Sequence, residues 1–310
     1  MKKVGIIGGS GFIGSYITKA FLDHGFEVKV SATDITREDK FQHLMKLNNS
    51  ENLYISELNV EDKTTLLDFV YDCDIVIHGG TPFILDVKDP QKELFDPTIQ
   101  GTINFLEAIK KTPGIEKVVF IASVAGWNTN FPFPADGKSA TDTFDESDTR
   151  FTSANSHPYA LAKFMANQVV EKYINDNPNL TFEITTVSPV GVMGKSLSSR
   201  EDSTSGGLQY LIKNKIAPDA FMQMLFDNDI LFSLIDVEDV AKAIFKAATT
   251  KGIHGKDYLL VTESYKISDM NLLLNQHEPN EKGIVVYKND LAKKDLNLNF
   301  KPVKDCLNNF

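Results

Sequence analysis

Residues 4–14 read VGIIGGSGFIG, a short apolar run that leads into glycines spaced three residues apart. The apolar run predicts a buried strand, and residues 14–24, which follow it, place apolar side chains on one face of a predicted helix. Gly8, Gly11 and Gly14 lie at the junction. There, the first glycine permits a tight turn, the second lets the backbone approach a diphosphate, and the third lets helix and strand pack closely. The stretch therefore predicts a loop that holds a dinucleotide.

The alternation of strand and helix continues along the chain. Further strands are expected at residues 28–32, 53–58, 74–78, 117–123, 182–188, 230–236, 258–261 and 283–287, and further helices at 64–71, 97–111, 158–175, 206–215 and 237–249. This order predicts an α/β protein with a Rossmann-type, doubly wound parallel sheet and a smaller C-terminal substrate-binding region. We expect residues 1–189 and 230–262 to form the dinucleotide-binding domain, and residues 190–229 and 263–310 to form the substrate-binding region.

Composition narrows the function classes. The 310 residues carry a formal net charge of -10, which argues against nucleic acid or an anionic membrane as a partner. The two cysteines do not suggest a disulfide framework, and the six histidines show no spacing typical of a metal site. The N-terminus does not resemble a signal peptide. We therefore expect a cytoplasmic protein that acts on a small molecule without a metal.

Three residues suggest proton transfer. Tyr159 and Lys163 stand four residues apart on a predicted helix and so share one face. A lysine ammonium beside a phenol favours the phenolate, so the tyrosine can exchange a proton with a substrate oxygen during hydride transfer. Ser123, at the end of a predicted strand, can hold the same oxygen. The pair alone says little, because this composition gives roughly 0.8 chance matches to its spacing. Its place after Ser123 and after the glycine loop makes it a candidate site.

The residues after the second strand leave the choice between NAD and NADP open. An acidic residue there would bind the ribose hydroxyls of NAD, whereas an arginine would hold the 2′-phosphate of NADP. Asp34, preceded by Thr33, lies slightly late in the chain for the first role. Arg37 is the arginine close enough for the second, and Lys40 is a weaker substitute. The sequence slightly favours NADP.

These motifs, in this order, resemble the extended short-chain dehydrogenase/reductase family, in particular its branch of dihydroflavonol, cinnamoyl-CoA and methylglyoxal reductases. The resemblance covers most of the chain to about residue 261. Besides the glycine loop, it rests on HGGTP at 78–82, the helix start at 97–102, VVFIAS at 118–123, PYALAK at 158–163 and IDVEDVA at 235–241. One departure concerns the cofactor, because the reductase branch usually has arginine where this chain has Thr33.

The resemblance implies roles for individual residues. Ser123, Tyr159 and Lys163 would carry catalysis, and Tyr159 and Lys163 would also contact the cofactor. The candidate cofactor-binding set is completed by Gly8, Gly11, Phe12, Ile13 and Gly14 at the pyrophosphate, Thr33, Asp34 and Arg37 after the second strand, Asn59 and Val60 beside the adenine, and Gly80, Thr81, Pro82 and Pro189 on the nicotinamide side.

The substrate pocket is expected between the strand ends, the long loop 127–157 and the segment 190–232. Phe83, Trp127, Phe131 and Met222 are candidates for its apolar walls. The first hypothesis for function is a carbonyl/alcohol oxidoreductase that uses NADP or NAD. An epimerase or dehydratase that retains its cofactor is one alternative, and a dinucleotide-binding regulator without catalysis is another. The family resemblance allows a monomer, or a homodimer formed through helices 97–111 and 158–175.

Overall fold

The computed structural model of the protein describes residues 1–79, 88–200 and 203–310. Its strands are β1 (Lys3–Ile7), β2 (Glu27–Ala32), β3 (Leu53–Glu57), β4 (Ile75–His78), β5 (Lys117–Ile121), β6 (Glu183–Pro189), β7 (Gly191–Met193), β8 (Leu231–Asp236), β9 (Asp257–Leu260) and β10 (Glu263–Lys266). Its helices are α1 (Phe12–Asp23), α2 (Lys63–Val70), α3 (Asp96–Lys111), α4 (Pro158–Asp176), α5 (Thr204–Asn214), α6 (Ala220–Asp227), α7 (Val237–Thr249), α8 (Ile267–Leu274), α9 (Asp290–Leu296) and α10 (Val303–Asn308).

The larger sheet has seven strands in the order β3-β2-β1-β4-β5-β6-β9. Every neighbouring pair in it is parallel. The chain builds outward from β1 to β3 and then crosses to the other side of β1 to begin β4. This reversal is the switch point at which doubly wound sheets bind their ligands, beyond the carboxyl ends of the strands. The predicted Rossmann-type parallel sheet is therefore confirmed.

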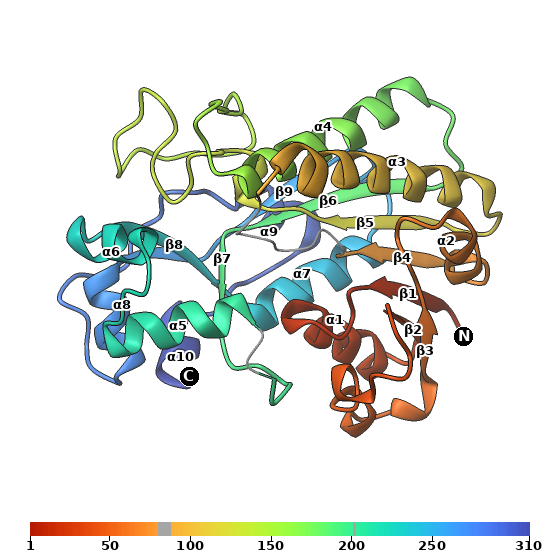
Figure 1. Ribbon diagram of the computed structural model, residues 1–310, viewed down its shortest axis with the longest axis horizontal. Coiled ribbons are helices and arrows are strands. Elements are labelled where there is room, and N and C mark those ends of the chain that lie inside the picture. The colour runs from red at the N-terminus through yellow and green to blue at the C-terminus, as the bar shows by residue number, and fades with distance from the viewer. Residues whose placement is uncertain (80–87, 201–202) are drawn as a thin grey trace.

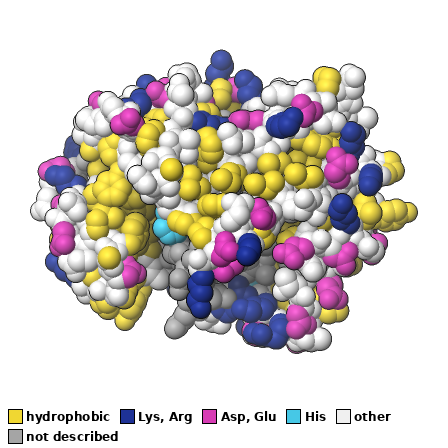
Figure 2. Space-filling model, turned by 45° about the horizontal axis from the view of Figure 1, so that its top comes forward, with side chains coloured by type: hydrophobic (Ala, Val, Ile, Leu, Met, Phe, Trp, Pro, Cys, Tyr) yellow, Lys and Arg dark blue, Asp and Glu magenta, His cyan; other side chains and the backbone are white. Residues whose placement is uncertain are grey.

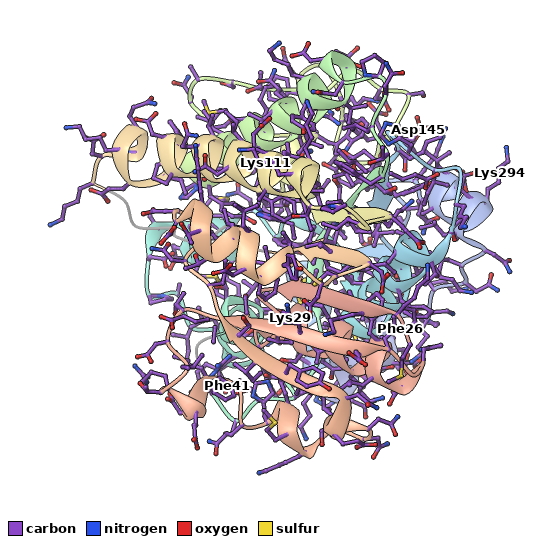
Figure 3. The ribbon with its side chains drawn as sticks, turned by 90° about the vertical axis from the view of Figure 1, so that its right-hand side faces the viewer. Phe26, Lys29, Phe41, Lys111, Asp145 and Lys294 are labelled. Carbon is purple, nitrogen blue, oxygen red and sulfur yellow. The ribbon has the colours of Figure 1, made fainter. Side chains whose placement is uncertain are left out.

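Helices cover both faces of this sheet, as parallel strands require. In Figure 1, α3 and α4 lie along one face, and α1 and α7 lie along the other. The side view of Figure 3 shows α3, marked by Lys111, stacked over the strands. Each face has an apolar core, with Phe69, Phe105 and Val118 in one cluster and Ile17 and Phe21 in the other. These two layers fix the positions of the loops at the carboxyl edge of the sheet.

A second, three-stranded sheet has the order β10-β8-β7 and packs with α5, α6, α8 and α10 around its own apolar cluster. Strand β8 pairs in parallel with β7 and antiparallel with β10. The sequence-based division groups residues 230–262 with the dinucleotide-binding domain. In the structure, β8 lies in the smaller sheet, while α7, which follows it, packs on α1 and covers the larger sheet.

Two further expectations differ from the structure. Residues 283–287 do not form a continuous strand, because Ile284 pairs singly with Ser264 and Tyr287 pairs singly with Phe144. The segment changes partner within three residues, so no ladder develops. The strand expected at 117–123 ends at Ile121, and its last two residues lead into a tight turn.

Candidate active site

The glycine loop makes a tight turn between β1 and α1. Gly8 has a φ of +80°, in the left-handed region that favours glycine, and its carbonyl accepts a hydrogen bond from the Gly11 N–H at 3.1 Å. A Cβ added to Gly14 would lie 2.0 Å from the Gly8 oxygen. In the part of the chain that the structure describes, no side chain caps the start of α1 and its first turn has no acidic residue. The first N–H groups of α1 and the positive end of its dipole therefore suit the diphosphate of a dinucleotide.

The loop after β2 carries the residues expected at the adenosine ribose. Thr33, Asp34 and Arg37 are all exposed. The Asp34 carboxylate accepts hydrogen bonds from the N–H and the hydroxyl of Thr36 at 2.8 and 2.6 Å, and these bonds lower the pKa of Asp34. The Arg37 guanidinium makes two contacts of 2.9 Å with Asp39, in a pair that is more than half exposed. Exposed pairs of this kind are weak, so Arg37 can exchange its partner for a phosphate.

Ser123, Tyr159 and Lys163 meet beyond the end of β5. Ser123 follows the strand by two residues, and its Oγ accepts a hydrogen bond from the Ala125 N–H at 3.1 Å. Tyr159 lies in the first turn of α4, and its side chain is hydrogen-bonded to that of Ser123. Lys163 follows one turn later, with its Nζ 5.8 Å from the centroid of the Tyr159 ring. The structure thus brings together the three residues that the sequence nominates for catalysis.

Burial controls the ionisation of this group. It lowers the pKa of Lys163 to about 8 and raises the pKa of Tyr159 above its ordinary value, an effect that the hydrogen bond with Ser123 opposes. His78, at the end of β4, is buried between aromatic rings, and burial together with the nearby Lys163 lowers its pKa to about 4. At neutral pH, His78 is therefore uncharged while most of Lys163 is an ammonium. That ammonium favours ionisation of the neighbouring phenol.

The remaining cofactor candidates lie at the same edge of the sheet. Phe12 and Ile13 open α1 and are partly buried, and Pro189 is buried at the end of β6. Asn59 and Val60 follow β3, and Asn59 is exposed. Four candidates, Gly80, Thr81, Pro82 and Phe83, lie outside the described residues.

The described substrate candidates do not form one surface. Trp127 belongs to the loop that follows Ser123, and its side chain is buried in the core. Phe131 is partly buried and packs edge-on against Phe232 of β8, with ring centroids 5.2 Å apart. Met222 is buried in α6, within the apolar cluster of the smaller sheet. Phe131 therefore lies at the junction of the two sheets, and the substrate roles of all three stay predictions.

Asp257, which the sequence did not single out, lies at the centre of a hydrogen-bond network behind the catalytic residues. Its carboxylate accepts hydrogen bonds from Trp127 Nε1 and Arg150 Nη2, both at 3.0 Å, and from Ser188 Oγ at 2.8 Å. An acidic residue at the start of a strand is ordinarily exposed, so the sequence carried no sign of this burial.

Arg200 is a second residue whose position the sequence did not predict. Its guanidinium donates to the backbone oxygens of Ser10, at 2.8 Å, and Lys40. The segment 195–200, which ends at Arg200, is also held by the Tyr16 hydroxyl, which donates to the Lys195 carbonyl at 2.7 Å. Arg200 thus connects the glycine loop to the loop after β2, and contacts across such a distance in sequence cannot be deduced from local patterns.

The described residues contain no group of histidine, cysteine or acidic side chains arranged to hold a metal ion. They also contain no helix long and apolar enough to cross a membrane. A hollow of about 630 Å³ lies at the opposite edge of the sheet, lined by residues such as Lys117, Glu183 and Thr250. It is remote from the strand ends where the catalytic candidates meet, so we base the site on those residues and not on that hollow.

Comparison with known sequences gives a consistent result. The profile of the NAD dependent epimerase/dehydratase family matches residues 4–260. Cinnamoyl-CoA reductase CAD2 from Medicago truncatula is 29% identical over 258 residues, which cover 80% of this chain and 74% of that protein. The bifunctional dihydroflavonol 4-reductase/flavanone 4-reductase from Malus domestica is 30% identical over 219 residues, which cover 69% of this chain and 61% of that protein.

Solved structures share the fold. Yeast methylglyoxal/isovaleraldehyde reductase Gre2, complexed with NADPH, superimposes with a TM-score of 0.81 at 22% identity, over 99% of this chain and 96% of that one. Vestitone reductase from alfalfa gives a TM-score of 0.75 at 19% identity, over 100% and 96% of the two chains. The architecture, the order of the motifs and the profile match agree. This chain belongs to the NAD-dependent epimerase/dehydratase family.

Proposed function

We propose that the protein is an oxidoreductase that transfers hydride between NADP or NAD and a small carbonyl or alcohol substrate. The observation that carries the proposal is the meeting of Ser123, Tyr159 and Lys163 at the edge of the sheet that also bears the glycine loop. Ligands of doubly wound sheets bind at this edge. The reductase names of the similar proteins support redox chemistry over epimerisation or dehydration.

When bound, the cofactor supplies or accepts the hydride. Tyr159 acts as general acid in reduction and as general base in oxidation, exchanging its hydroxyl proton with the substrate oxygen. Ser123, already hydrogen-bonded to Tyr159, orients that oxygen. Lys163 provides the positive charge that makes the phenol a stronger acid.

The dinucleotide would be held mainly by backbone and by a few cations. Gly8, Gly11 and Gly14 form the diphosphate cradle described above. Arg37 and Arg200 place two guanidinium groups close to this end of the sheet, and guanidinium is well suited to phosphate. We therefore favour NADP over NAD, as the NADPH complex of the yeast reductase also suggests. Contacts from Phe12, Ile13, Thr33, Asp34, Asn59, Val60 and Pro189 belong to the same proposal.

The proposal also covers the cellular compartment and the oligomeric state. Cys73 and Cys306 are free and buried, which fits a reducing compartment such as the cytoplasm. Figure 2 shows hydrophobic side chains exposed on the face of the molecule that includes α3 and α4, and Ile103 of α3 is 39% exposed. A homodimer formed through these helices would cover such side chains. A monomer is the alternative.

The proposal is tested with a panel of aldehydes, ketones and alcohols and both cofactors, followed by NAD(P)H absorbance. Net cofactor consumption supports the oxidoreductase, turnover without it supports an epimerase or dehydratase, and binding without turnover supports a regulator. Tyr159→Phe should lower kcat by about 10² to 10⁴-fold, since it removes the general acid, and should leave the cofactor Kd nearly unchanged. Tyr173→Phe, on the same helix, is the matched control because its hydroxyl donates to the Leu106 carbonyl, at 3.3 Å. Near-normal activity of Tyr159→Phe would refute the assigned role.

A further inference from the structure

The Asp257 carboxylate joins four segments that the chain order separates. Its Oδ2 accepts from Trp127, in the loop after Ser123, and from Arg150, in the long loop before α4. Its Oδ1 accepts from Ser188, next to Pro189 at the end of β6. The Asn167 amide of α4 approaches Oδ2 at 3.5 Å. One largely buried side chain at the start of β9, 12% exposed, therefore contacts the segments that carry the catalytic candidates.

The path from this carboxylate to the catalytic residues is short. Asn167 follows Lys163 by four residues and so lies on the same face of α4. The turn after Ser123 packs directly on that face, because a Cβ added to Gly126 would lie 2.7 Å from Asn167 Nδ2 and 3.3 Å from the Lys163 carbonyl oxygen. Trp127 ends this turn. Fixing Trp127 and α4 to one carboxylate therefore fixes the distance between Ser123 and Lys163.

The donors around Asp257 need an acceptor, and an ionised carboxylate binds them more strongly than a neutral group does. An indole and a guanidinium can donate hydrogen bonds but cannot accept them. The Arg150 guanidinium also stacks over the Trp127 ring, 4.2 Å from its centroid, so the three side chains form one packed unit. The other charged groups that face this unit are Glu171 of α4, 2.6 Å from Arg150, and Glu146, in the loop before Arg150. Protonation of Asp257 would leave the Trp127 and Arg150 donors opposite a neutral group.

We propose that ionised Asp257 is a positioning residue, which holds the Ser123 turn, α4 and the end of β6 in their catalytic arrangement. The inference rests on the proposed oxidoreductase function for its catalytic consequence. Burial raises the pKa of Asp257 to about 6, so this arrangement loosens in mildly acidic solution. The loss of activity as the pH falls is then caused by protonation of Asp257, which acts through the catalytic residues and not by contact with the substrate or the cofactor.

Trp127 is the only tryptophan in the chain, so its fluorescence reports on this network directly and without turnover. In the parent protein, a fluorescence titration should show a transition with a midpoint close to pH 6. Asp257→Asn should abolish the transition. Glu146→Gln is the matched control, because it neutralises a neighbouring, partly buried carboxylate that accepts from the Leu259 N–H and not from the Trp127 indole, which donates to Asp257. It should retain the transition.

Activity supplies the second measurement. Asp257→Asn should lower kcat by about tenfold to 10²-fold, as small displacements of catalytic groups do, with the Kd for the cofactor within about twofold of the parent value. In contrast to the parent protein, the kcat of Asp257→Asn should not fall as the pH drops below 6. Conservative Ser188→Ala removes one donor and should give a smaller loss.

The outcomes of these experiments distinguish the oxidoreductase function from the positioning role of Asp257. A parent protein that titrates near pH 6 by fluorescence but turns over no substrate with either cofactor would refute the oxidoreductase and, with it, the positioning role. A normal kcat and an unchanged acidic limb in Asp257→Asn would refute the positioning role alone. A tryptophan transition that persists in Asp257→Asn would show that another group titrates and would also overturn the inference.

Discussion

Replacing Asp257 by asparagine removes the charge of a buried carboxylate while keeping its shape. Burial raises the pKa of Asp257 from 3.8 to about 6, against the opposing effects of Arg150 and of the hydrogen bond from Ser188. The folded protein thus binds this proton more tightly than the unfolded chain does, so the stability that the group contributes is present at low pH and is lost as the pH rises through about 6. Ionising Asp257 in the folded state costs about 3 kcal/mol, since one pKa unit corresponds to about 1.4 kcal/mol.

About half of this cost is already present at pH 5, so the other half accumulates between pH 5 and pH 8. The unfolding free energy of Asp257→Asn minus that of the parent should therefore increase by roughly 1 to 2 kcal/mol over this interval. The substitution also removes one of the two carboxylates that contact Arg150, the other being Glu171, and this adds a constant offset that leaves the trend in place. Urea titrations followed by circular dichroism measure the difference at each pH. Asp176→Asn, at an exposed position of α4, is the control and should show no such increase. A flat or falling difference for Asp257→Asn would mean that folding does not raise the pKa of this carboxyl, and would refute the reasoning.

Three other outcomes are expected. Arg37→Ala should weaken binding of NADPH by roughly tenfold and leave binding of NADH unaffected, whereas Arg200→Ala should weaken binding of both cofactors, because Arg200 contacts the glycine loop. Fluorescence titration measures the two dissociation constants. An equal loss of NADPH and NADH affinity in Arg37→Ala would exclude a role for Arg37 at the phosphate. Since the pKa of Lys163 is about 8, the rate of reduction should fall as the pH rises through about 8 and the ammonium is lost. Lys163→Arg should shift this fall in rate to higher pH. A rate in the parent protein that stays constant up to pH 10 would contradict this expectation. Gly14→Ala should prevent cofactor binding and lower the Tm, because its methyl group would lie 2.0 Å from a backbone oxygen, whereas Gly101→Ala, in open space, should do neither.

The sequence predicts local features of this molecule well, because they depend on residues close together in the chain. The glycine loop needs only a strand, a turn and a helix, and the pairing of Tyr159 with Lys163 needs only a helical turn. The parallel sheet follows from the alternation of elements. All three are present in the structure.

Features that depend on distant parts of the chain could not be predicted in this way. Strand β8 pairs with β7 and β10 in the smaller sheet, although β6 and β9 of the larger sheet lie almost as near to it in sequence. No local pattern distinguishes the two pairings. Asp257 and Trp127 are 130 residues apart, and Arg200 and Ser10 are 190 apart. In the sequence, Asp257 is an ordinary polar residue at the start of a strand and Trp127 an ordinary apolar one. Only the fold makes them partners.

The charge of Asp257 reduces stability and, by our inference, maintains catalytic geometry. Stability alone would favour a neutral or apolar side chain at such a buried position. The Trp127 indole and the Arg150 guanidinium can only donate, however, and the ionised carboxylate accepts from both and from Ser188 with charge-assisted hydrogen bonds, which are stronger than those to a neutral group. The ionised Asp257 lowers the free energy of unfolding of the whole protein. Its structural effect is local, because it fixes the contact between the Ser123 turn and α4, which Gly126 makes possible by lacking a side chain. A buried group whose energetic cost and structural benefit fall in different places is expected where a protein needs fixed geometry for chemistry more than it needs additional stability.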